Sequence, residues 1–328
     1  MLSSVGKPLA RGFRIAVALG AVVSAQAQEI PKSLVLTSAP DGSGLAYGVY
    51  LGGKGSILVY RPGPVPKQLF IELNKDQWLG ASLTLLDEPT QIAHYQLDGD
   101  PKLVGVWDPV QIATTKDLAS ITSVRAFHPG GVIRGDLAKT LSYGVIQPVG
   151  RTVPLYEIRF ESRPDDRYPS AFVFSEQNRL VGLMNSSLAG PSAEHGTETF
   201  GPAGLSIGYA LSTNVLQRVM DGFLSKSGYP KHPTLGMTFK NHASGVQVVS
   251  VQEGSPAGNA GLKPNDLILK VDGQTSPNAF QLGAKLFGKS VGDTVTLEWS
   301  RSGSKKVQTT KVTLSDYYTL QKKNVVSG

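Results

Sequence analysis

The sequence predicts a mainly β protein that ends in a smaller α+β module, and three observations lead to this prediction. From Ser33 to about Tyr209, short apolar runs are broken by Gly, Pro and Asp, with almost no helical periodicity. The first convincing helical pattern comes only at Ser212–Lys226. After a proline-containing linker, short strands then alternate with two helices. A chain of 328 residues is long enough for two or three domains with their own cores.

The first 28 residues have the three regions of an export signal. Three basic residues precede an apolar run at Ile15–Val23, and Ala25-Gln26-Ala27 supplies a small-x-small cleavage site. The apolar run is shorter than the roughly 20 residues that a membrane-spanning helix needs. The alternative is a buried N-terminal helix. We therefore predict a signal peptide at residues 1–28 and a periplasmic or secreted protein without a membrane span.

Composition excludes several classes of function. There is no cysteine in the chain, which rules out disulfides, thiolate metal sites and cysteine catalysis. Without the leader, 29 basic residues face 25 acidic ones, and this net charge of +4 is scattered along the chain. Such a distribution gives no support for a nucleic-acid partner. The five histidines are far apart in the sequence, so neither a metal site nor a cofactor is predicted. Two of them, His232 and His242, lie at the linker and are expected to be exposed to solvent.

Many short strands separated by turns at regular spacing indicate a β-sandwich or barrel. A helix at Ser212–Lys226 follows them, because Ser212 or Thr213 can cap it, apolar residues recur at helical spacing, and Gly228 can end it. The predicted strands of this first region are Ser33–Leu36, Leu45–Leu51, Ser56–Tyr60, Gln68–Glu72, Ser82–Leu86, Leu103–Trp107, Thr140–Gln147, Leu155–Phe160, Ala171–Phe174 and Leu180–Met184.

Two prolines stiffen residues 229–233, which we take as the linker between residues 29–228 and a module at 234–316, with a tail at 317–328. Asp272-Gly273 predicts a tight hairpin turn inside the module. The predicted elements of the module are a strand at Val246–Val251, a short helix opened by Ser255-Pro256-Ala257, a strand at Leu267–Val271, a helix at Pro277–Phe287, and strands at Thr294–Arg301 and Lys306–Leu314.

The segment Gly254–Ile268 closely resembles the signature of PDZ domains attached to bacterial HtrA-type proteases, and the match extends over essentially the whole module. Leu235-Gly236-Met237-Thr238 fits the peptide-binding loop of that family. The resemblance implies that an extended peptide adds to a sheet edge while backbone N–H groups hold its terminal carboxylate. The predicted peptide-binding residues are Leu235, Gly236, Met237, Thr238, Leu282 and Leu286.

Two of these predictions depend on local geometry. Gly236 has no Cβ, so a ligand backbone could approach it closely. Leu282 and Leu286 lie four residues apart on one helix face, where they could line the groove or equally belong to the core of a small domain.

The earlier region resembles HtrA-type serine proteases in faint but collinear pieces. Arg167–Leu183 resembles the nucleophile segment, Gly48–Val59 the hairpin before the catalytic histidine, and Gly208-Tyr209-Ala210-Leu211 the strand before the closing helix. The resemblance implies that residues 29–228 form a trypsin-like double β-barrel. The predicted fold class is therefore mainly β, with this double barrel followed by an α+β PDZ domain.

Counting along these matches, the positions of the catalytic histidine, aspartate and serine fall on Pro62, Gln91 and Pro169. None of these side chains can act as the nucleophile, base or carboxylate of a triad. We therefore expect that the chain is not an enzyme. The predicted function is a protease-like protein that binds protein or peptide C-termini as a scaffold, a chaperone-like holder of unfolded envelope proteins or an adaptor for an active protease. The resemblance also allows a homo-oligomer.

The alternative hypothesis is an active serine endopeptidase of envelope protein quality control with a rearranged site. Ser170 lies one residue after Pro169 and could act as the nucleophile. His94 is a possible base, although it is expected on a strand of the first barrel rather than on a loop facing the serine. Residues 187–200 are polar and form either an activation or specificity loop or an ordinary surface loop.

Overall fold

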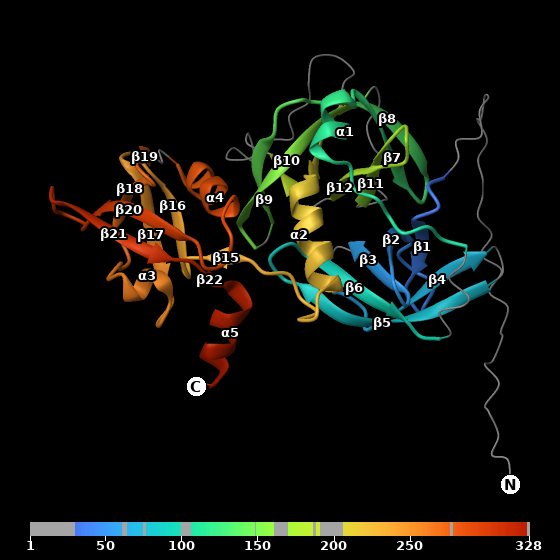
Figure 1. Ribbon diagram of the computed structural model, residues 1–328, viewed down its shortest axis with the longest axis horizontal. Coiled ribbons are helices and arrows are strands. Elements are labelled where there is room, and N and C mark those ends of the chain that lie inside the picture. Colours follow the sequence, from blue (N-terminus) through green and yellow to red (C-terminus); the bar gives the residue numbers. More distant parts are fainter. Residues whose placement is uncertain are drawn as a thin grey trace, which may run out of the picture. The chain divides into compact units, whose positions relative to one another are not determined.

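The computed structural model describes residues 30–60, 64–74, 77–99, 106–147, 149–160, 170–185, 188–190, 206–275 and 278–326. The predicted signal peptide, Pro62, Pro169 and most of the loop at 187–200 lie outside these residues. The fold is mainly β, as predicted, with two closed barrels followed by an α+β module (Figure 1).

The first lobe is a closed barrel with the strand order β1-β2-β3-β6-β5-β4. It closes because β1 pairs with both β2 and β4. Its strands are β1 (Leu34–Ser38), β2 (Ala46–Gly52), β3 (Ser56–Tyr60), β4 (Gln68–Asn74), β5 (Gln77–Asp87) and β6 (Ile92–Leu97).

The second lobe is an eight-stranded sheet with the order β13-β9-β10-β14-β12-β11-β7-β8, and a further pairing of β10 with β8 closes six of its strands into a barrel. Its strands are β7 (Ser123–His128), β8 (Gly131–Leu137), β9 (Ser142–Ile146), β10 (Arg151–Phe160), β11 (Ser170–Ser175), β12 (Leu180–Asn185), β13 (Leu188–Ala189) and β14 (Ser206–Leu211).

The two barrels share one apolar core, which explains why several strands are apolar on both faces. Along β3, Ile57 and Val59 fill the first barrel, whereas Leu58 and Tyr60 belong to a cluster that also holds Phe172, Phe174 and Leu183 of the second barrel. Strands buried on both faces become continuous apolar runs instead of alternating ones. The uninterrupted run Ser56–Tyr60 therefore marks a strand packed between two layers.

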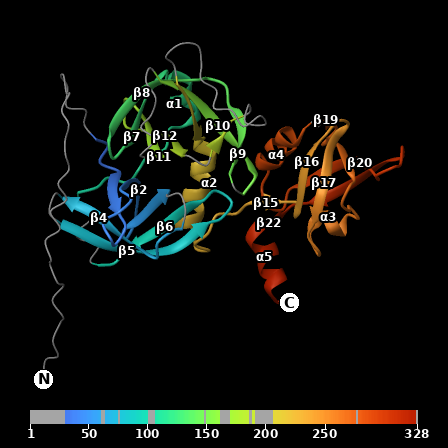
Figure 2. The same ribbon diagram turned by 180° about the vertical axis from the view of Figure 1, so that it is seen from behind.

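Helix α2 (Thr213–Leu224) adds its apolar stripe to this shared core. Its buried residues recur at helical spacing, and Val215, Leu216 and Val219 are essentially inaccessible. In Figures 1 and 2 the helix, in yellow, lies alongside the strands of the second barrel. Helix α2 thus lies where the sequence predicted it, although the Ser212 side chain forms no capping hydrogen bond.

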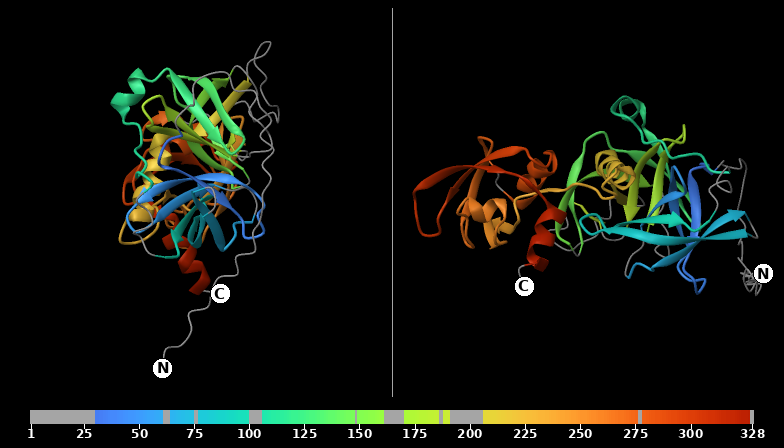
Figure 3. Two further views of the ribbon diagram at one scale, coloured as in Figure 1. Left: turned by 90° about the vertical axis from the view of Figure 1, so that its right-hand side faces the viewer. Right: turned by 60° about the horizontal axis from the view of Figure 1, so that its bottom comes forward.

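The C-terminal module contains a sheet in the order β16-β17-β18-β20-β21, with β19 paired to β18 at the predicted hairpin. Short strands β15 and β22 pair with each other. Helix α5 follows and is the red helix beside the label C in Figure 3. The elements are β15 (Pro233–Thr234), β16 (Met237–His242), β17 (Gly245–Val251), α3 (Pro256–Asn259), β18 (Leu267–Val271), β19 (Gln274–Thr275), α4 (Ala279–Phe287), β20 (Thr294–Ser300), β21 (Val307–Thr313), β22 (Ser315–Asp316) and α5 (Tyr317–Val326).

The structure contains elements that the sequence analysis did not predict. Helix α1 (Thr115–Ser120) is capped by a reciprocal pair in which Thr114 and Asp117 each accept from the other's backbone N–H. Strand β8 was missed because most of its residues are exposed and Gly and charged residues interrupt its apolar ones, and its neighbour β7 was also missed. The predicted strand at Leu103–Trp107 has no counterpart in its described residues, 106 and 107, and the predicted tail at 317–328 contains α5.

Gly222 of α2 offers a test of how tightly the linker packs on the barrels. A Cβ at this position would lie 2.2 Å from the Cα of Pro230. Alanine favours a helix over glycine by about 1 kcal/mol, but overpacking typically costs about 1–3 kcal/mol. We expect Gly222→Ala to lower the thermal unfolding midpoint, measured by circular dichroism.

Gly288→Ala is the matched control for this substitution. Gly288 has a φ of −69° and ends α4, and the nearest atom to an added Cβ lies 3.7 Å away. This variant should unfold within about 0.5 kcal/mol of the parent chain. If Gly222→Ala were as stable as Gly288→Ala, the close packing of α2 on Pro230 would be wrong.

Candidate functional site

The predicted peptide-binding groove lies between β16 and α4. Strand β16 is an edge of its sheet, since it pairs only with β17 among the described strands. Helix α4 packs against β16 and β17, and the backbone N–H of Ala279 donates to Oδ1 of Asn241 over 2.7 Å. An edge strand beside a helix is the arrangement that strand addition requires.

The loop before β16 is fixed by the protein's own contacts. The C=O of Leu235 accepts from Ala257 N–H, and the C=O of Gly236 accepts from Gln252 N–H, both over 2.9 Å. The N–H of Gly236 donates to Oγ1 of Thr234 over 3.0 Å. These bonds tie the loop to the segment that leads into α3.

Gly236 is required here by internal packing. Its φ is +68°, and an added Cβ would lie 2.4 Å from Cβ of Ser255 and 3.0 Å from Cδ1 of Leu320. Sequence reasoning explained this glycine by the approach of a ligand, whereas the structure supplies a reason within the chain itself. The role of Gly236 in peptide binding stays a prediction. Leu320 of α5 was not anticipated, because its place against this loop depends on the tertiary fold.

The other predicted groove residues divide into two groups. Leu235, Leu282 and Leu286 are buried in the core cluster of the module, and Leu282 has no exposed surface. Met237 is partly buried against that cluster, and Thr238 is exposed with its hydroxyl 2.6 Å from Oγ of Ser250. Met237 is therefore the predicted groove residue with apolar surface left to offer a ligand.

Of the three triad positions inferred from the sequence, only Gln91 lies in the described part of the chain. Gln91 has a φ of +60°, and its Nε2 donates to the backbone C=O of Glu88 over 2.7 Å. It closes the turn between β5 and β6, so its amide serves the local turn. Pro62 and Pro169 lie outside the described residues, and the structure does not test the predicted loss of the triad.

Ser170 is the first residue of β11 and is only 6% exposed. Side chains alternate along a strand, so its hydroxyl lies on the same face as Phe172 and Phe174. Both phenylalanines pack in the core shared by the barrels. Among the described residues, His94 contacts Thr84 and His232 contacts Asp87, and no described hydrogen bond joins either imidazole to the Ser170 hydroxyl as an activating base.

His94 lies on β6 and is held in place by contacts with Thr84 of β5 and Phe223 of α2. Its Nδ1 lies 2.5 Å from Oγ1 of Thr84, and its ring stacks on Phe223 with the centroids 4.9 Å apart. Burial lowers the pKa of His94 to about 4, so the ring is neutral at pH 7. Its Nε2 has no hydrogen-bond partner in the described structure. His94 and Ser170 are not joined by a described hydrogen bond, so the structure does not assemble the sequence-predicted pair as a dyad.

A buried polar network that the sequence analysis missed surrounds Asp87, the last residue of β5. Nε2 of His232 lies 2.8 Å from one Asp87 carboxylate oxygen, and the hydroxyl of Tyr318 donates to the same oxygen over 2.7 Å. Thr90 donates to the other oxygen. His232 was predicted to be solvent-exposed, but it is 1% exposed and Asp87 is fully buried. The correction has a simple cause, because a partner 145 residues away leaves no local signal.

The protonation state of His232 follows from its surroundings. Burial lowers its pKa, the hydrogen bond and charge of Asp87 raise it, and the positive charges of Arg151 and Arg218 lower it again. The balance lies on the lower side, so the ring is neutral and its Nε2–H donates to the carboxylate. The donors of His232, Tyr318 and Thr90 together compensate the buried charge of Asp87.

Two further observations limit the chemistry of the described residues. In the ranges that the structure describes, no group of three or more His, Cys, Asp or Glu side chains is arranged to hold a metal ion. No described helix is long and apolar enough to cross a bilayer.

Comparison with known proteins agrees with this architecture. Residues 233–314 match the PDZ domain family. The serine protease Do-like HtrA of Lactococcus lactis subsp. cremoris (strain MG1363) is 22% identical over 303 residues, which cover 84% of this chain and 71% of that protein. A probable periplasmic serine endoprotease DegP-like of Halomonas elongata is 26% identical over 272 residues, or 78% of this chain and 52% of that protein.

Among solved structures, the HtrA-type protease AlgW with a decapeptide matches with a TM-score of 0.58 at 15% identity. The match covers 87% of this chain and 95% of AlgW. The chain therefore has the double-barrel and PDZ architecture of HtrA-type serine proteases, and it is similar to them in sequence over most of its length.

These comparisons overturn the prediction that the chain is not an enzyme. Its relatives are named serine proteases and its structural neighbours are HtrA-type proteases, which points to a protease. The prediction failed because it depended on counting single positions along short, weak matches. A shift of one residue exchanges Pro169 for Ser170.

The lowered pKa of His94 predicts how the stability of the folded protein depends on pH. Its folded pKa of about 4 is below the ordinary 6.5, so the unfolded chain binds a proton first. The contribution of neutral His94 to the free energy of unfolding is fully present above pH 6.5 and is lost as the pH falls towards 4. The loss between pH 7 and pH 5 is about 2 kcal/mol. His232 acts in the same direction, because its pKa is also lowered.

We expect His94→Phe, which keeps a ring against Phe223, to reduce this loss of stability on acidification. The measurement is urea unfolding of both proteins at pH 7 and pH 5. His242→Phe is the control, because His242 is exposed and should leave the pH dependence unchanged. An equal pH dependence in His94→Phe and the parent chain would contradict the assignment.

Proposed function

We propose that the chain is an exported serine endopeptidase of HtrA type that captures extended polypeptide through its PDZ domain. The observation that carries this proposal is the order of the domains. Two β-barrels around a shared core precede a PDZ domain with the exposed edge strand β16, and the sequence is similar to serine proteases of that organisation over 84% of the chain.

Export is supported by two independent features. The basic, apolar and small-residue regions of the first 28 residues follow the order of a signal peptide. One of the relatives is described as probably periplasmic. Substrates in that compartment would be unfolded or damaged envelope proteins.

Ser170 is the nucleophile that we propose. It opens the strand that follows the nucleophile turn in the resemblance, and its hydroxyl lies on the face of β11 that looks into the core between the barrels. Asp87, which is saturated by His232, Tyr318 and Thr90, is not available to orient a base for it.

In this proposal the PDZ domain binds the substrate. The unpaired edge of β16 offers backbone hydrogen bonds to an extended chain, and Met237 offers apolar surface beside them. Binding at this edge would be largely independent of peptide sequence, which suits a protease that acts on many unfolded proteins.

A fluorophosphonate probe tests the catalytic part of the proposal. The parent chain should be labelled covalently and should hydrolyse an unfolded protein substrate. Ser170→Ala should abolish labelling and lower hydrolysis by at least about a thousandfold, because the nucleophile is removed. Labelling is read by mass spectrometry, which also identifies the modified residue.

Ser123→Ala is the control for this experiment, because Ser123 begins another strand of the same barrel and is only partly buried. It should keep both labelling and hydrolysis. A parent chain that neither labels nor hydrolyses the substrate, or a label that persists in Ser170→Ala, would rule out Ser170 as the nucleophile.

Peptide capture is tested separately from hydrolysis. Met237→Ala should weaken binding of a peptide with an apolar C-terminal residue about tenfold, because roughly 1.5 kcal/mol of buried apolar contact is lost. Binding is measured by fluorescence anisotropy in the Ser170→Ala background. Val249→Ala is the control, since Val249 is 48% exposed on the neighbouring strand. Equal affinities for Met237→Ala and Val249→Ala would exclude Met237 from the groove.

A further inference from the structure

The sheet of the PDZ domain has a second edge, which the proposed function does not use. Strand β21 ends the sheet opposite β16, and its one described strand partner is β20. An edge strand presents unpaired N–H and C=O groups, and these can accept another extended chain.

The hydrogen bonds around β20 show which residues of β21 face outward. The N–H of Leu314 donates to the C=O of Asp293 over 2.8 Å, so the backbone of Leu314 faces the β20 side. Backbone groups alternate along a strand, and Thr309, Lys311 and Thr313 therefore point away from the sheet. Leu297 pairs with Thr310 in the same register, which agrees with this assignment.

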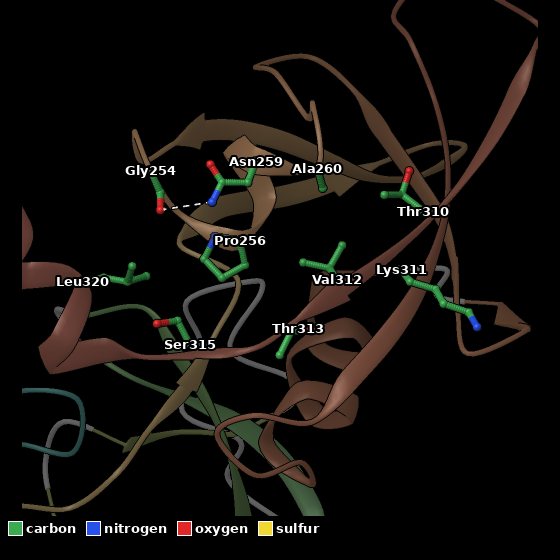
Figure 4. A pocket seen from close by; sticks show the side chains of 10 residues that line it. All are labelled: Gly254, Pro256, Asn259, Ala260, Thr310, Lys311, Val312, Thr313, Ser315 and Leu320. Atoms are coloured by element: carbon green, nitrogen blue, oxygen red, sulfur yellow. Dashed lines mark hydrogen bonds between the residues drawn. The ribbon is translucent and has the colours of Figure 1, made fainter.

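A cavity of about 400 Å³ lies along this edge, between α3 and β21 (Figure 4). Pro256 and Ala260 line it from the α3 side, and residues 310–313 line it from β21. Val312 and Leu320 form apolar parts of its wall, although both are almost completely buried, and Ser315 also lines it. A helix beside an unpaired strand, with a cavity between them, leaves room for an added strand.

The charged residues near the β21 edge indicate which kind of ligand would bind there. Lys305, Lys306 and Lys311 are exposed on the β20–β21 hairpin and on β21, and none of them forms a described ion pair. Two acidic residues adjoin the lining in sequence: Glu253 precedes Gly254, and the buried Asp316 follows Ser315. Lys311 itself lines the cavity and is exposed, so an acidic partner is attracted to this edge.

The same lysines argue against a second copy of this chain as the occupant. Pairing β21 with another β21 would bring Lys311 close to the lysines of its copy, and like charges across a strand pair are destabilising. A lysine in an edge strand is a common way to prevent such self-association.

We propose that β21 and α3 form a second groove, which binds an extended acidic segment of an unfolded polypeptide by strand addition. The segment pairs with the outward backbone groups of Thr309, Lys311 and Thr313. Its alternate side chains enter the cavity beside Val312 and Leu320, and its acidic groups lie near the lysines. The proposal needs neither Ser170 nor the groove at β16, so its outcome is independent of hydrolysis.

The probe is a labelled twelve-residue peptide in which glutamate and valine alternate, acetylated at its N-terminus and amidated at its C-terminus. Without a terminal carboxylate it lacks the group held by the loop at Gly236. Binding to the full chain carrying Ser170→Ala is measured by fluorescence anisotropy at low and high salt. We expect micromolar affinity that falls as the salt concentration rises.

Three substitutions of Lys311 separate the contribution of its backbone N–H to peptide binding from the contribution of its charge. Lys311→Pro removes an outward N–H without taking a bond from the β20 ladder and should weaken binding at least tenfold. Lys311→Glu keeps the N–H but reverses the charge, and should weaken binding at least tenfold at low salt. Lys311→Thr keeps the N–H without charge and should lose less than fivefold. Thermal unfolding midpoints check that each variant is folded.

Met237→Ala is the control for the other groove and should bind this peptide like the parent chain. The proposal is overturned if Lys311→Pro and Lys311→Glu both bind normally. It is also overturned if a peptide with a free apolar C-terminus competes fully with the probe, or if sedimentation shows that the free chain dimerises through β21 and Lys311→Pro dissociates the dimer.

Discussion

The apolar core shared by the two barrels is the constraint on which the arrangement of the proposed catalytic region depends. Strands such as β3 and β11 are buried on both faces, one inside their own barrel and the other against the neighbouring barrel. A fully buried Phe or Leu side chain stabilises the fold by about 1.5–3 kcal/mol, so Phe172 and Phe174 hold β11 firmly in this core. These two side chains therefore also fix the position of Ser170, because side chains alternate along β11 and Ser170 lies on the same face.

Within the PDZ domain, positions are set mainly by packing of the chain on itself. Gly236 fits between Ser255 and Leu320, and the loop that resembles a carboxylate-binding loop is tied to the start of α3 by backbone hydrogen bonds. A loop with its conformation fixed before a ligand arrives loses little entropy on binding. The two edges of the sheet lie beside different helices, β16 beside α4 and β21 beside α3.

The buried network of Asp87, His232, Tyr318 and Thr90 shows a different kind of constraint. A carboxylate with no exposed surface is expensive unless donors surround it, and here three side chains do so. The network joins the turn between β5 and β6 to the linker and to α5. Removing one partner would leave the others buried without a hydrogen bond, so these residues depend on each other more than on their local sequence.

Local patterns in the sequence determined much of the fold. Ser56–Tyr60, Leu267–Val271 and the Asp272-Gly273 hairpin lie where the residues predicted them, and the helix at Thr213–Leu224 was expected within a few residues. These elements depend on side-chain periodicity, caps and turns, which act over a few residues. The largely exposed strand β8 and the short helix α1 were not predicted, because their stability comes from neighbouring strands and from one capping pair.

Long-range contacts were decided by the tertiary structure alone. His232 looked like an exposed linker residue, yet it pairs with Asp87 in the interior, and Gly236 owes its necessity partly to Leu320, 84 residues later. Whether Leu282 belonged to core or groove was also undecided until its burial was known. The sequence by itself determined the order of the domains and most of their strands. Which distant side chains meet was decided only when the barrels and the PDZ sheet closed, because contact at that range depends on topology and packing rather than on local propensity.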